Sequence, residues 1–459
     1  MAWHRLRLSL GAKLARLWPV LAVGWVAGTV YVLTVAPSLT WAHWGTDGGD
    51  FVTAAATGRL PHPPGFPIYY LLSRAIVSVV PGDPAKLLNA LSAAMATGAA
   101  CWTAAAAQRR GASSWVVLAT GLGLAFAPWV WSQAVIAEVY TCVAFFTALV
   151  LYLASSGSMD SPRDSWITGL ALGMAASVHP TALGLLVVVG SLRQVAWPWL
   201  ALGLGLGLTP YVLLPLAGPW PQPWGDLNSL GGWWHYVSGR LYWGNAFGLP
   251  LDRWPQRVLA WAGHLARQFT PLGAMATLLG LRRLWQVERR LAVGIVLAVS
   301  LLSVYAIGYN SADSWVYLVA YLPALAIAMG HGLQRLAAFR VPQYVSLVIP
   351  FVLLLVNWSA MDVHADYEAV DWLADTLEGL PQQAVVLTEQ DAHTFTLWYG
   401  VDALGLRQDA TVVDTRLWGF EPYVGFIRRR VGEPVTTPAM LASEGALCEI
   451  DEDGLIRCR

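Results

Sequence analysis

Apolar runs that carry no charge and are long enough to cross a bilayer recur through the first 361 residues. The first of them extends from Pro19 to Pro37, and similar runs follow as far as Ser359. Only 12% of the residues are charged, about half the share expected of a soluble chain. We therefore expect a membrane all-α fold with about 11 transmembrane helices in residues 1–361.

The distribution of basic residues predicts the orientation of these helices. Four basic residues precede the first apolar run, and the positive-inside rule places them and the N-terminus in the cytoplasm. Two segments are then extracytoplasmic: a first outer loop at 37–81, and a long outer loop at 217–268 rich in Trp, Pro and Gly. Within the first loop, residues 67–80 are apolar but too short to span, which favours a helix lying in the interface. The four basic residues are Arg5, Arg7, Lys13 and Arg16.

Residues 362–459 differ in composition from the rest and predict a small extracytoplasmic α/β domain. Helical patterns at 366–380, 391–404 and 421–432 alternate with strand patterns at 384–389 and 410–417. Near the C-terminus, Cys448 and Cys458 flank an Asp-Gly turn signal. A disulfide between them is one expectation, and a pair of free thiols is the other. The chain has no net charge and no long basic run, which argues against nucleic acid as a partner.

Acidic residues are scarce before residue 362, which makes two of them in the first outer loop informative. Of the 28 Asp and Glu residues, 18 lie from Asp362 onward. Asp47 and Asp50 stand within one turn of each other, with two glycines between them. Transfer of a group to a hydroxyl needs a carboxylate that takes the proton. We expect Asp47 to be this base and Asp50 the assisting acid. The alternative is that both acids only cap a helix.

Several stretches resemble the protein O-mannosyltransferase-like family of the GT-C glycosyltransferase superfamily. They are the run from Asp47 to His62-Pro-Pro-Gly-Phe-Pro, then SQAVIAEVYT at 132–141, GWWHYVSGRLYWGNAFG at 232–248, YNSADSWVYLVAYLP at 309–323 and the 391–399 region. The family pattern Asp-x-Gly-acid falls on residues 47–50, where Asp50 replaces the usual Glu. The resemblance implies a GT-C-type bundle, a polyprenyl-phosphate-linked sugar donor, an inverting transfer and an extracytoplasmic acceptor hydroxyl.

Other polar residues near the outer ends of the apolar runs are candidates for binding the donor or the acceptor. His62 can contact the donor phosphate or orient the carboxylates, or it can simply end a turn before Pro63. Arg240 is the first candidate for the cation that meets the departing phosphate, with Arg74 and Arg253 as substitutes and headgroup snorkelling as the alternative. The complete candidate set is His62, Glu138, His179, His235, Arg240, Tyr242 and Asp313.

Three functions of different kinds compete at this point. The leading hypothesis is a glycosyltransferase without cofactors, with mannose as one candidate sugar and a protein, lipid or glycan as acceptor. The second is a transporter or lipid flippase that uses Asp47, Glu138 and Asp313 for coupling, although no internal repeat supports it. The third is a scaffold that displays its C-terminal domain. The sequence lacks metal-ligand spacing; Asp47 and Asp50 can hold a divalent ion, but the family resemblance implies a metal-independent reaction.

Overall fold

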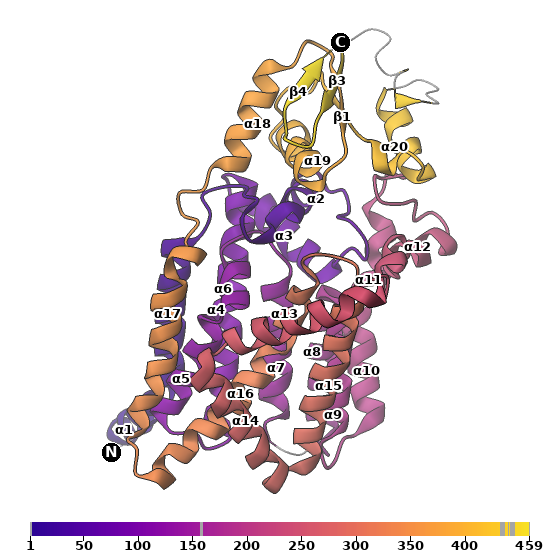
Figure 1. Ribbon diagram of the computed structural model, residues 1–459. Coiled ribbons are helices and arrows are strands. Elements are labelled where there is room, and N and C mark those ends of the chain that lie inside the picture. The colour runs from indigo at the N-terminus through magenta and orange to yellow at the C-terminus, as the bar shows by residue number, and fades with distance from the viewer. Residues whose placement is uncertain (1, 157–158, 432–436, 439, 441–445, 459) are drawn as a thin grey trace.

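The protein consists of a helical bundle with a small C-terminal unit stacked on one end (Figure 1). The computed structural model describes residues 2–156, 159–431, 437–438, 440 and 446–458, and it describes side chains from Leu17 onward. The basic side chains at positions 5, 7, 13 and 16, on which the expected orientation depends, therefore lie outside the described part.

Six helical segments of the described chain are long and apolar enough to cross a membrane, and a bent pair makes a possible seventh span. The bent pair is α5 and α6, which meet at 62°. The sequence-based number of about 11 is higher because it includes shorter apolar helices such as α7, and it stays a prediction. The bundle helices are α1 (Ala2–Thr34), α4 (Pro84–Arg109), α5 (Ser114–Ala125), α6 (Pro128–Ala134), α7 (Tyr140–Ala154), α8 (Pro162–Val178), α9 (Leu185–Gly190), α10 (Trp197–Leu208), α11 (Pro210–Leu213), α14 (Thr270–Val287), α15 (Arg289–Gly308), α16 (Leu322–Leu333) and α17 (Val348–Met361).

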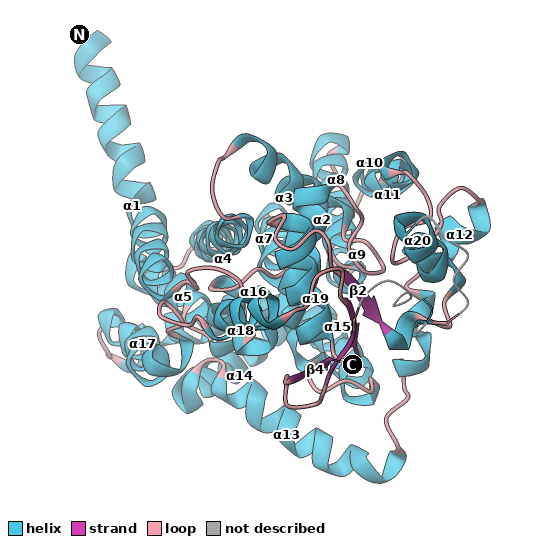
Figure 2. Ribbon diagram, turned by 90° about the horizontal axis from the view of Figure 1, so that it is seen from above, coloured by secondary structure: helices cyan, strands magenta, loops and turns pink. Residues whose placement is uncertain are grey.

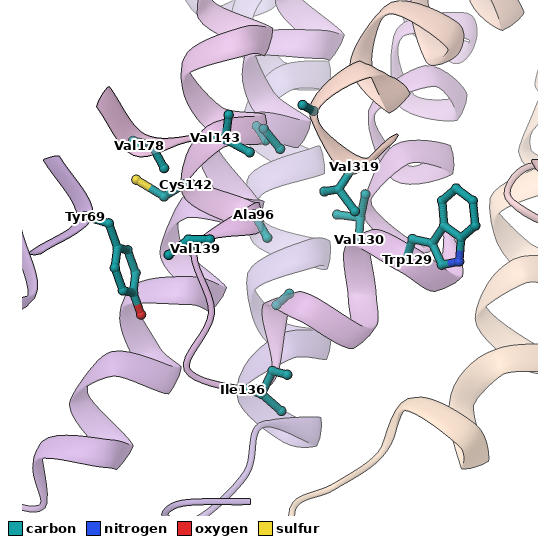
Figure 3. Packing of buried hydrophobic residues seen from close by; sticks show 14 of the residues in the cluster. Tyr69, Ala96, Trp129, Val130, Ile136, Val139, Cys142, Val143, Val178 and Val319 are labelled. Atoms are coloured by element: carbon teal, nitrogen blue, oxygen red, sulfur yellow. The ribbon is translucent and has the colours of Figure 1, made fainter. Parts of the chain in front are cut away.

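Glycines allow two pairs of these helices to pack with their backbones in direct contact. A side chain at Gly169 of α8 would collide with the backbone of Leu200 on α10, and one at Gly280 of α14 would collide with Ala328 on α16. Small residues at such crossings let helices approach closely where the surrounding lipid offers no hydrophobic driving force. Figure 3 shows part of the buried core, including Val130 of α6 and Val319 of the segment Ser314–Tyr321, two segments that contact each other.

The two outer loops are folded rather than extended. The first contains a 3-10 turn, η1 (Ala42–Asp47), followed by α2 (Gly48–Thr57) and α3 (Pro67–Val79). The guanidinium of Arg74 on α3 donates to the carbonyls of Ala55 and Ala56 at the end of α2, so this arginine ties the two helices together. The long outer loop contains α12 (Leu230–Val237) and α13 (Trp254–Arg267), with 3-10 turns at Arg240–Asn245 and Leu251–Arg253.

The C-terminal unit contains a four-stranded sheet with the strand order β2-β1-β3-β4. β1 pairs in parallel with both β2 and β3, and β4 runs antiparallel to β3. A disulfide joins Cys448 and Cys458 across that last pair. Its elements are α18 (Glu368–Gly379), β1 (Val385–Thr388), α19 (Asp391–Trp398), a π-helical turn (Tyr399–Ala403), β2 (Thr411–Asp414), α20 (Glu421–Val431), β3 (Leu447–Ile450) and β4 (Ile456–Cys458).

The C-terminal unit is docked on the first outer loop, chiefly by α19 against α2, which lie next to each other in Figure 2. A side chain at Gly49 would meet the Phe395 carbonyl oxygen at 2.5 Å, so only glycine permits this approach. Tyr399 donates from its hydroxyl to Asp83, with the two oxygens 2.7 Å apart. The unit is thereby held in a defined position over the loop that carries Asp47.

Candidate active site

A cavity of about 990 Å³ lies where the bundle, the two outer loops and the C-terminal unit meet. This volume is at the upper end of the range of small-molecule sites. Polar side chains enter it from both outer loops, from the end of α8, from the turn after α15 and from the C-terminal unit. Those that can carry charge are Asp47, His62, His179, Asp313, Asp391, Asp414 and Arg416.

Asp50 holds the first outer loop in shape from behind the cavity. Its side chain is almost completely buried, and its two oxygens accept three hydrogen bonds. Oδ2 accepts from the backbone nitrogen of His62 at 2.7 Å and from its ring Nδ1 at 2.9 Å. Oδ1 accepts from the indole nitrogen of Trp224 at 3.0 Å. Because an ionised carboxylate can only accept, Nδ1 of His62 carries a proton.

Asp47 stands on the other side of the same imidazole ring. Oδ2 of Asp47 lies 3.7 Å from Nε2 of His62, and 36% of its side chain remains exposed, toward the cavity that it lines. Burial alone would lower the pKa of His62, but the charge of Asp47 and the hydrogen bond to Asp50 outweigh it and raise this pKa to about 9. His62 is therefore an imidazolium at neutral pH, held between two carboxylates.

At Asp47, by contrast, the effect of burial on the pKa outweighs the effect of the neighbouring positive charge. Burial raises the pKa of Asp47 to about 7, while the positive charge of His62 opposes the shift and the carboxylates of Asp391, Asp313 and Asp50 add to it. A carboxylate whose pKa lies near neutrality is well matched to taking and returning a proton at that pH.

The backbone that leads to Asp47 is strained. His43 and Trp44 both adopt positive φ angles, 56° and 66°, in the left-handed region that non-glycine residues rarely occupy. Such residues cost on the order of 1–3 kcal/mol each and persist where the surrounding structure imposes them. Two in succession immediately before a cavity-facing carboxylate indicate that the position of Asp47 is enforced.

Aromatic rings form a continuous wall of the cavity beside Asp313. Tyr317 is its centre, with ring centroids 5.4 Å from His179, 5.5 Å from Tyr309 and 6.0 Å from Tyr305. Next to this wall the lining is aliphatic and comes from α15, including Leu301, whose side chain is 55% exposed. The cavity therefore combines an aromatic wall with an apolar edge.

The other residues singled out from the sequence lie in different places. His179, Tyr242 and Asp313 line the cavity. Glu138 is buried away from the lining, where its carboxylate accepts from the backbone nitrogen of Val139. Two others also stand outside the lining: His235 stacks on Phe420, and the exposed Arg240 lies over Trp243.

Sequence reasoning missed the charged residues that the C-terminal unit contributes. Asp391 begins α19 just after β1, Asp414 ends β2, and Arg416 follows it. The carboxyl ends of adjacent parallel strands lie at one edge of a sheet, which is where such sheets bind ligands, so the strand pattern held a usable signal. Acids are abundant in this region, so Asp391 and Asp414 did not stand out from the others.

No cluster of three or more His, Cys, Asp or Glu side chains suited to a metal ion occurs among the residues that the structure describes. Metal independence of the reaction stays a prediction.

Comparison with known sequences identifies relatives of this chain. The family model of the protein O-mannosyl-transferase TMEM260 N-terminal domain matches residues 47–197. The protein O-mannosyl-transferase TMEM260 of Mus musculus is 22% identical over 88% of this chain and 63% of its own length. The relative of that name in Dictyostelium discoideum is 20% identical over 85% of this chain and 56% of its own. The chain thus spans about three fifths of the length of these curated relatives.

Solved structures share the fold. ArnT from Cupriavidus metallidurans in the apo state has a TM-score of 0.55 at 14% identity, with 97% of this chain and 94% of ArnT covered. The same protein bound to undecaprenyl phosphate has a TM-score of 0.54 at 14% identity, over 87% and 90% of the two chains. An oligosaccharyltransferase of Archaeoglobus fulgidus tethered to an acceptor peptide reaches 0.54 at 10% identity, over 91% and 68%.

The chain thus shares the fold of these solved membrane-protein structures, and its described part contains six helical segments long and apolar enough to cross a membrane. In sequence, the chain is similar to the protein O-mannosyl-transferases named TMEM260. The resemblance to the protein O-mannosyltransferase-like family that the sequence motifs indicate is confirmed.

Proposed function

We propose that this protein transfers a sugar, with mannose as the first candidate, from a polyprenyl-phosphate-linked donor to a hydroxyl of an extracytoplasmic protein acceptor. The observation that carries the proposal is Asp47, a cavity-facing carboxylate that follows two strained residues and is held beside the imidazolium of His62. The relatives named protein O-mannosyl-transferase support the reaction type, and the undecaprenyl phosphate bound by ArnT supports the donor class.

The two ends of a lipid-linked donor suit two parts of the cavity. The polyprenyl chain enters from the bilayer along the aliphatic edge formed by α15, where Leu301 lines the cavity and is 55% exposed. The sugar lies against the aromatic wall around Tyr317, since aromatic faces pack well on the apolar faces of sugars. Asp313 accepts hydrogen bonds from sugar hydroxyls, and the phosphate lies near the imidazolium of His62.

The transfer then proceeds in one displacement at the anomeric carbon. Asp47 removes the proton of the acceptor hydroxyl as its oxygen forms a bond to that carbon. The bond from the carbon to the phosphate oxygen breaks, and its electron pair leaves with the polyprenyl phosphate. The nearby charge of His62 stabilises the negative charge that develops on this leaving group. Attack from the face opposite the phosphate inverts the anomeric configuration.

Asp50 acts on this chemistry through His62 and not by direct contact with a substrate. Its three accepted hydrogen bonds fix the ring in place and hold it in the protonated form, so we assign Asp50 as a positioning residue. Asp50 thus assists Asp47, as the sequence predicts, but it does so only by positioning His62. No cofactor is required, because the activated donor supplies the free energy of transfer.

We also propose the membrane orientation that the basic residues predict. The N-terminus lies in the cytoplasm, and the first outer loop, the long outer loop and the domain at 362–459 are extracytoplasmic. In this arrangement the shorter apolar helices, among them α7, also cross and bring the total to about 11 spans.

The test is transfer by the purified protein in lipid nanodiscs, with a radiolabelled polyprenyl-phosphate sugar and a peptide rich in Ser and Thr. We expect turnover by the wild type and a fall in kcat of about 10²–10⁴-fold in Asp47→Asn, because the amide cannot take the proton. An unchanged thermal unfolding midpoint would show that the fold is retained. Asp252→Asn, at an exposed position of the long outer loop, is the matched control and should leave kcat unchanged.

Three results would overturn the proposal or one of its parts. Transfer that persists in Asp47→Asn would remove the base from the mechanism. Movement of ions or lipids that requires no sugar donor would favour the transporter instead, and acceptance of sugar by a lipid or glycan only would exclude a protein acceptor.

A further inference from the structure

Two charged side chains of the C-terminal unit face the cavity as a pair. Nη2 of Arg416 lies 2.6 Å from Oδ1 of Asp391, and both residues line the cavity that contains Asp47. The side chains are 42% and 49% exposed, so a bound molecule can reach them. The mechanism above uses neither residue.

A buried carboxylate holds Arg416 in this position. Asp414 is completely buried, and its Oδ1 and Oδ2 accept from Nε and Nη2 of Arg416 at 3.1 and 2.6 Å. Asp414 also accepts from the hydroxyl of Thr394 at 3.1 Å, which ties it to α19. The guanidinium is therefore fixed from behind by Asp414, while Asp391 meets it at the cavity surface.

The exposed part of this pair offers a donor group, on Arg416, next to an acceptor group, the carboxylate of Asp391. The other terminal nitrogen of Arg416, Nη1, makes no hydrogen bond to any residue that the structure describes, and a guanidinium nitrogen of this kind carries two N–H donors. The carboxylate of Asp391 keeps lone pairs for further hydrogen bonds. A neutral group that both accepts and donates, such as the peptide unit of a polypeptide, matches this arrangement.

Charge argues against the alternative that Arg416 binds the donor phosphate. One guanidinium is shared by two carboxylates, so the three side chains together carry a net negative charge. A phosphate placed there would meet this charge in a partly buried site, where repulsion is strong. The imidazolium of His62 is a better partner for the phosphate, and the pair is left for an uncharged ligand.

The position of the pair relative to Asp47 is set by the docking of the whole unit. Trp41 of the first outer loop donates from its indole nitrogen to the hydroxyl of Thr396 on α19 at 2.9 Å. Arg59, which follows α2, forms an ion pair with Asp402 at 2.9 Å. These contacts keep Asp391 at the start of α19 within electrostatic range of the base, since its charge acts on Asp47.

We propose that Asp391 and Arg416 form an acceptor subsite that binds the main chain of the polypeptide next to the hydroxyl to be glycosylated. This inference rests on the proposed function and adds to it. The C-terminal unit thereby sets the affinity for the acceptor, whereas the first outer loop performs the chemistry. Both residues act by binding, so their loss should affect KM for the acceptor and spare the donor.

The experiment compares Asp391→Asn and Arg416→Gln with the full-length wild type in nanodiscs. We expect KM for a Ser/Thr peptide to rise about ten- to a hundredfold, as for the loss of a hydrogen bond to a charged group. KM for the donor should stay within about twofold, and so should kcat at saturating peptide. Arg457→Gln breaks an exposed ion pair of the same unit, with Asp451, and is the matched control.

A direct binding measurement separates this inference from the proposed function. Fluorescence anisotropy of a labelled Ser/Thr peptide reports acceptor binding without any transfer, and polyprenyl phosphate alone reports donor binding. If the wild type transfers no sugar but binds the peptide and Arg416→Gln does not, the proposed reaction fails and the subsite stands. Should Arg416→Gln not fold, as judged by thermal unfolding, the more exposed Asp391→Asn carries the test.

Three outcomes would overturn the subsite. Loss of polyprenyl phosphate binding in Arg416→Gln, with peptide binding intact, would make Arg416 a donor-phosphate contact. Unchanged acceptor KM in both variants would make the pair a purely structural contact of the C-terminal unit. Displacement of the labelled peptide by an oligosaccharide and not by an unlabelled peptide would assign the pair to a carbohydrate.

Discussion

The first outer loop and the C-terminal unit both place carboxylates around one cavity, but they hold them differently. In the loop, Asp50 is buried, with every contact to His62 and Trp224 fixed from inside the protein. In the unit, Asp391 is half-exposed and makes its ion pair at the cavity surface. A group that sets the protonation of a neighbour must be locked, whereas a group that recognises a passing ligand must stay reachable. This difference fits the proposed division, in which the loop performs the chemistry and the unit recognises the acceptor.

The largest effect expected from this comparison is in Asp50→Asn. An amide offers one acceptor where the carboxylate offers two, so its NH2 group would face a donor and turn the ring of His62. We expect kcat to fall about a hundredfold, as for a small misplacement of catalytic groups, with donor and acceptor KM little changed. Steady-state kinetics measure it. A variant with normal kcat would show that the locked arrangement of the loop has no catalytic role.

A second prediction concerns the pH dependence of kcat/KM. The base works when deprotonated, and burial raises the pKa of Asp47 to about 7, so activity should rise about tenfold per pH unit until that point. Activity should fall again above about 9, where His62, whose pKa is raised by Asp47 and Asp50 against the effect of burial, loses its proton.

The variant His62→Gln tests this prediction more sharply, because the direction of the expected shift in the pKa of Asp47 is known. The positive charge of His62 opposes the increase in the pKa of Asp47 that burial causes. Removing that charge must therefore move the acid limb of the profile to higher pH. A limb that stays in place or moves to lower pH would show that the two groups do not interact. Asp391→Asn should shift the same limb in the opposite direction, because the charge of Asp391 adds to the increase.

The smallest expected effect is in Arg240→Gln. Arg240 is exposed, lies over Trp243 and does not line the cavity. We expect kcat and the donor KM to remain within about twofold of the wild type, which is the behaviour of a surface substitution. A large loss of donor binding would instead return Arg240 to the role of phosphate cation, and the division of labour between loop and unit would need revision.

Sequence reasoning worked best where acids are rare. In the apolar part of the chain, a carboxylate in a loop next to a bilayer is costly to keep, so Asp47, Asp50 and Asp313 stood out, and two of them line the cavity. Glu138 stood out for the same reason, yet its carboxylate caps a backbone nitrogen away from the cavity. Scarcity therefore identified acids of the apolar region but not what each of them faces.

In the C-terminal unit, the scarcity of acids gave no signal, because Asp391 is one acid among many. The parallel pairing of β1 and β2 brings Asp391 to the same edge of the sheet as Asp414 and Arg416. Arg74 and Arg240 are the opposite case. The sequence made both of them candidates for the phosphate cation, but neither lines the cavity.

The sequence by itself determined which proteins this one resembles: its apolar runs predict a membrane bundle, and the Asp47 to His62 motif carries the resemblance to its relatives. Only the tertiary structure decided which charges share the cavity. Hydropathy and local patterns act over a few residues, whereas Asp391 and Arg416 reach Asp47 across more than 300 positions of chain. The arrangement of these residues around one cavity depends on the contact of α19 with α2, where Gly49 leaves room for the backbone of Phe395.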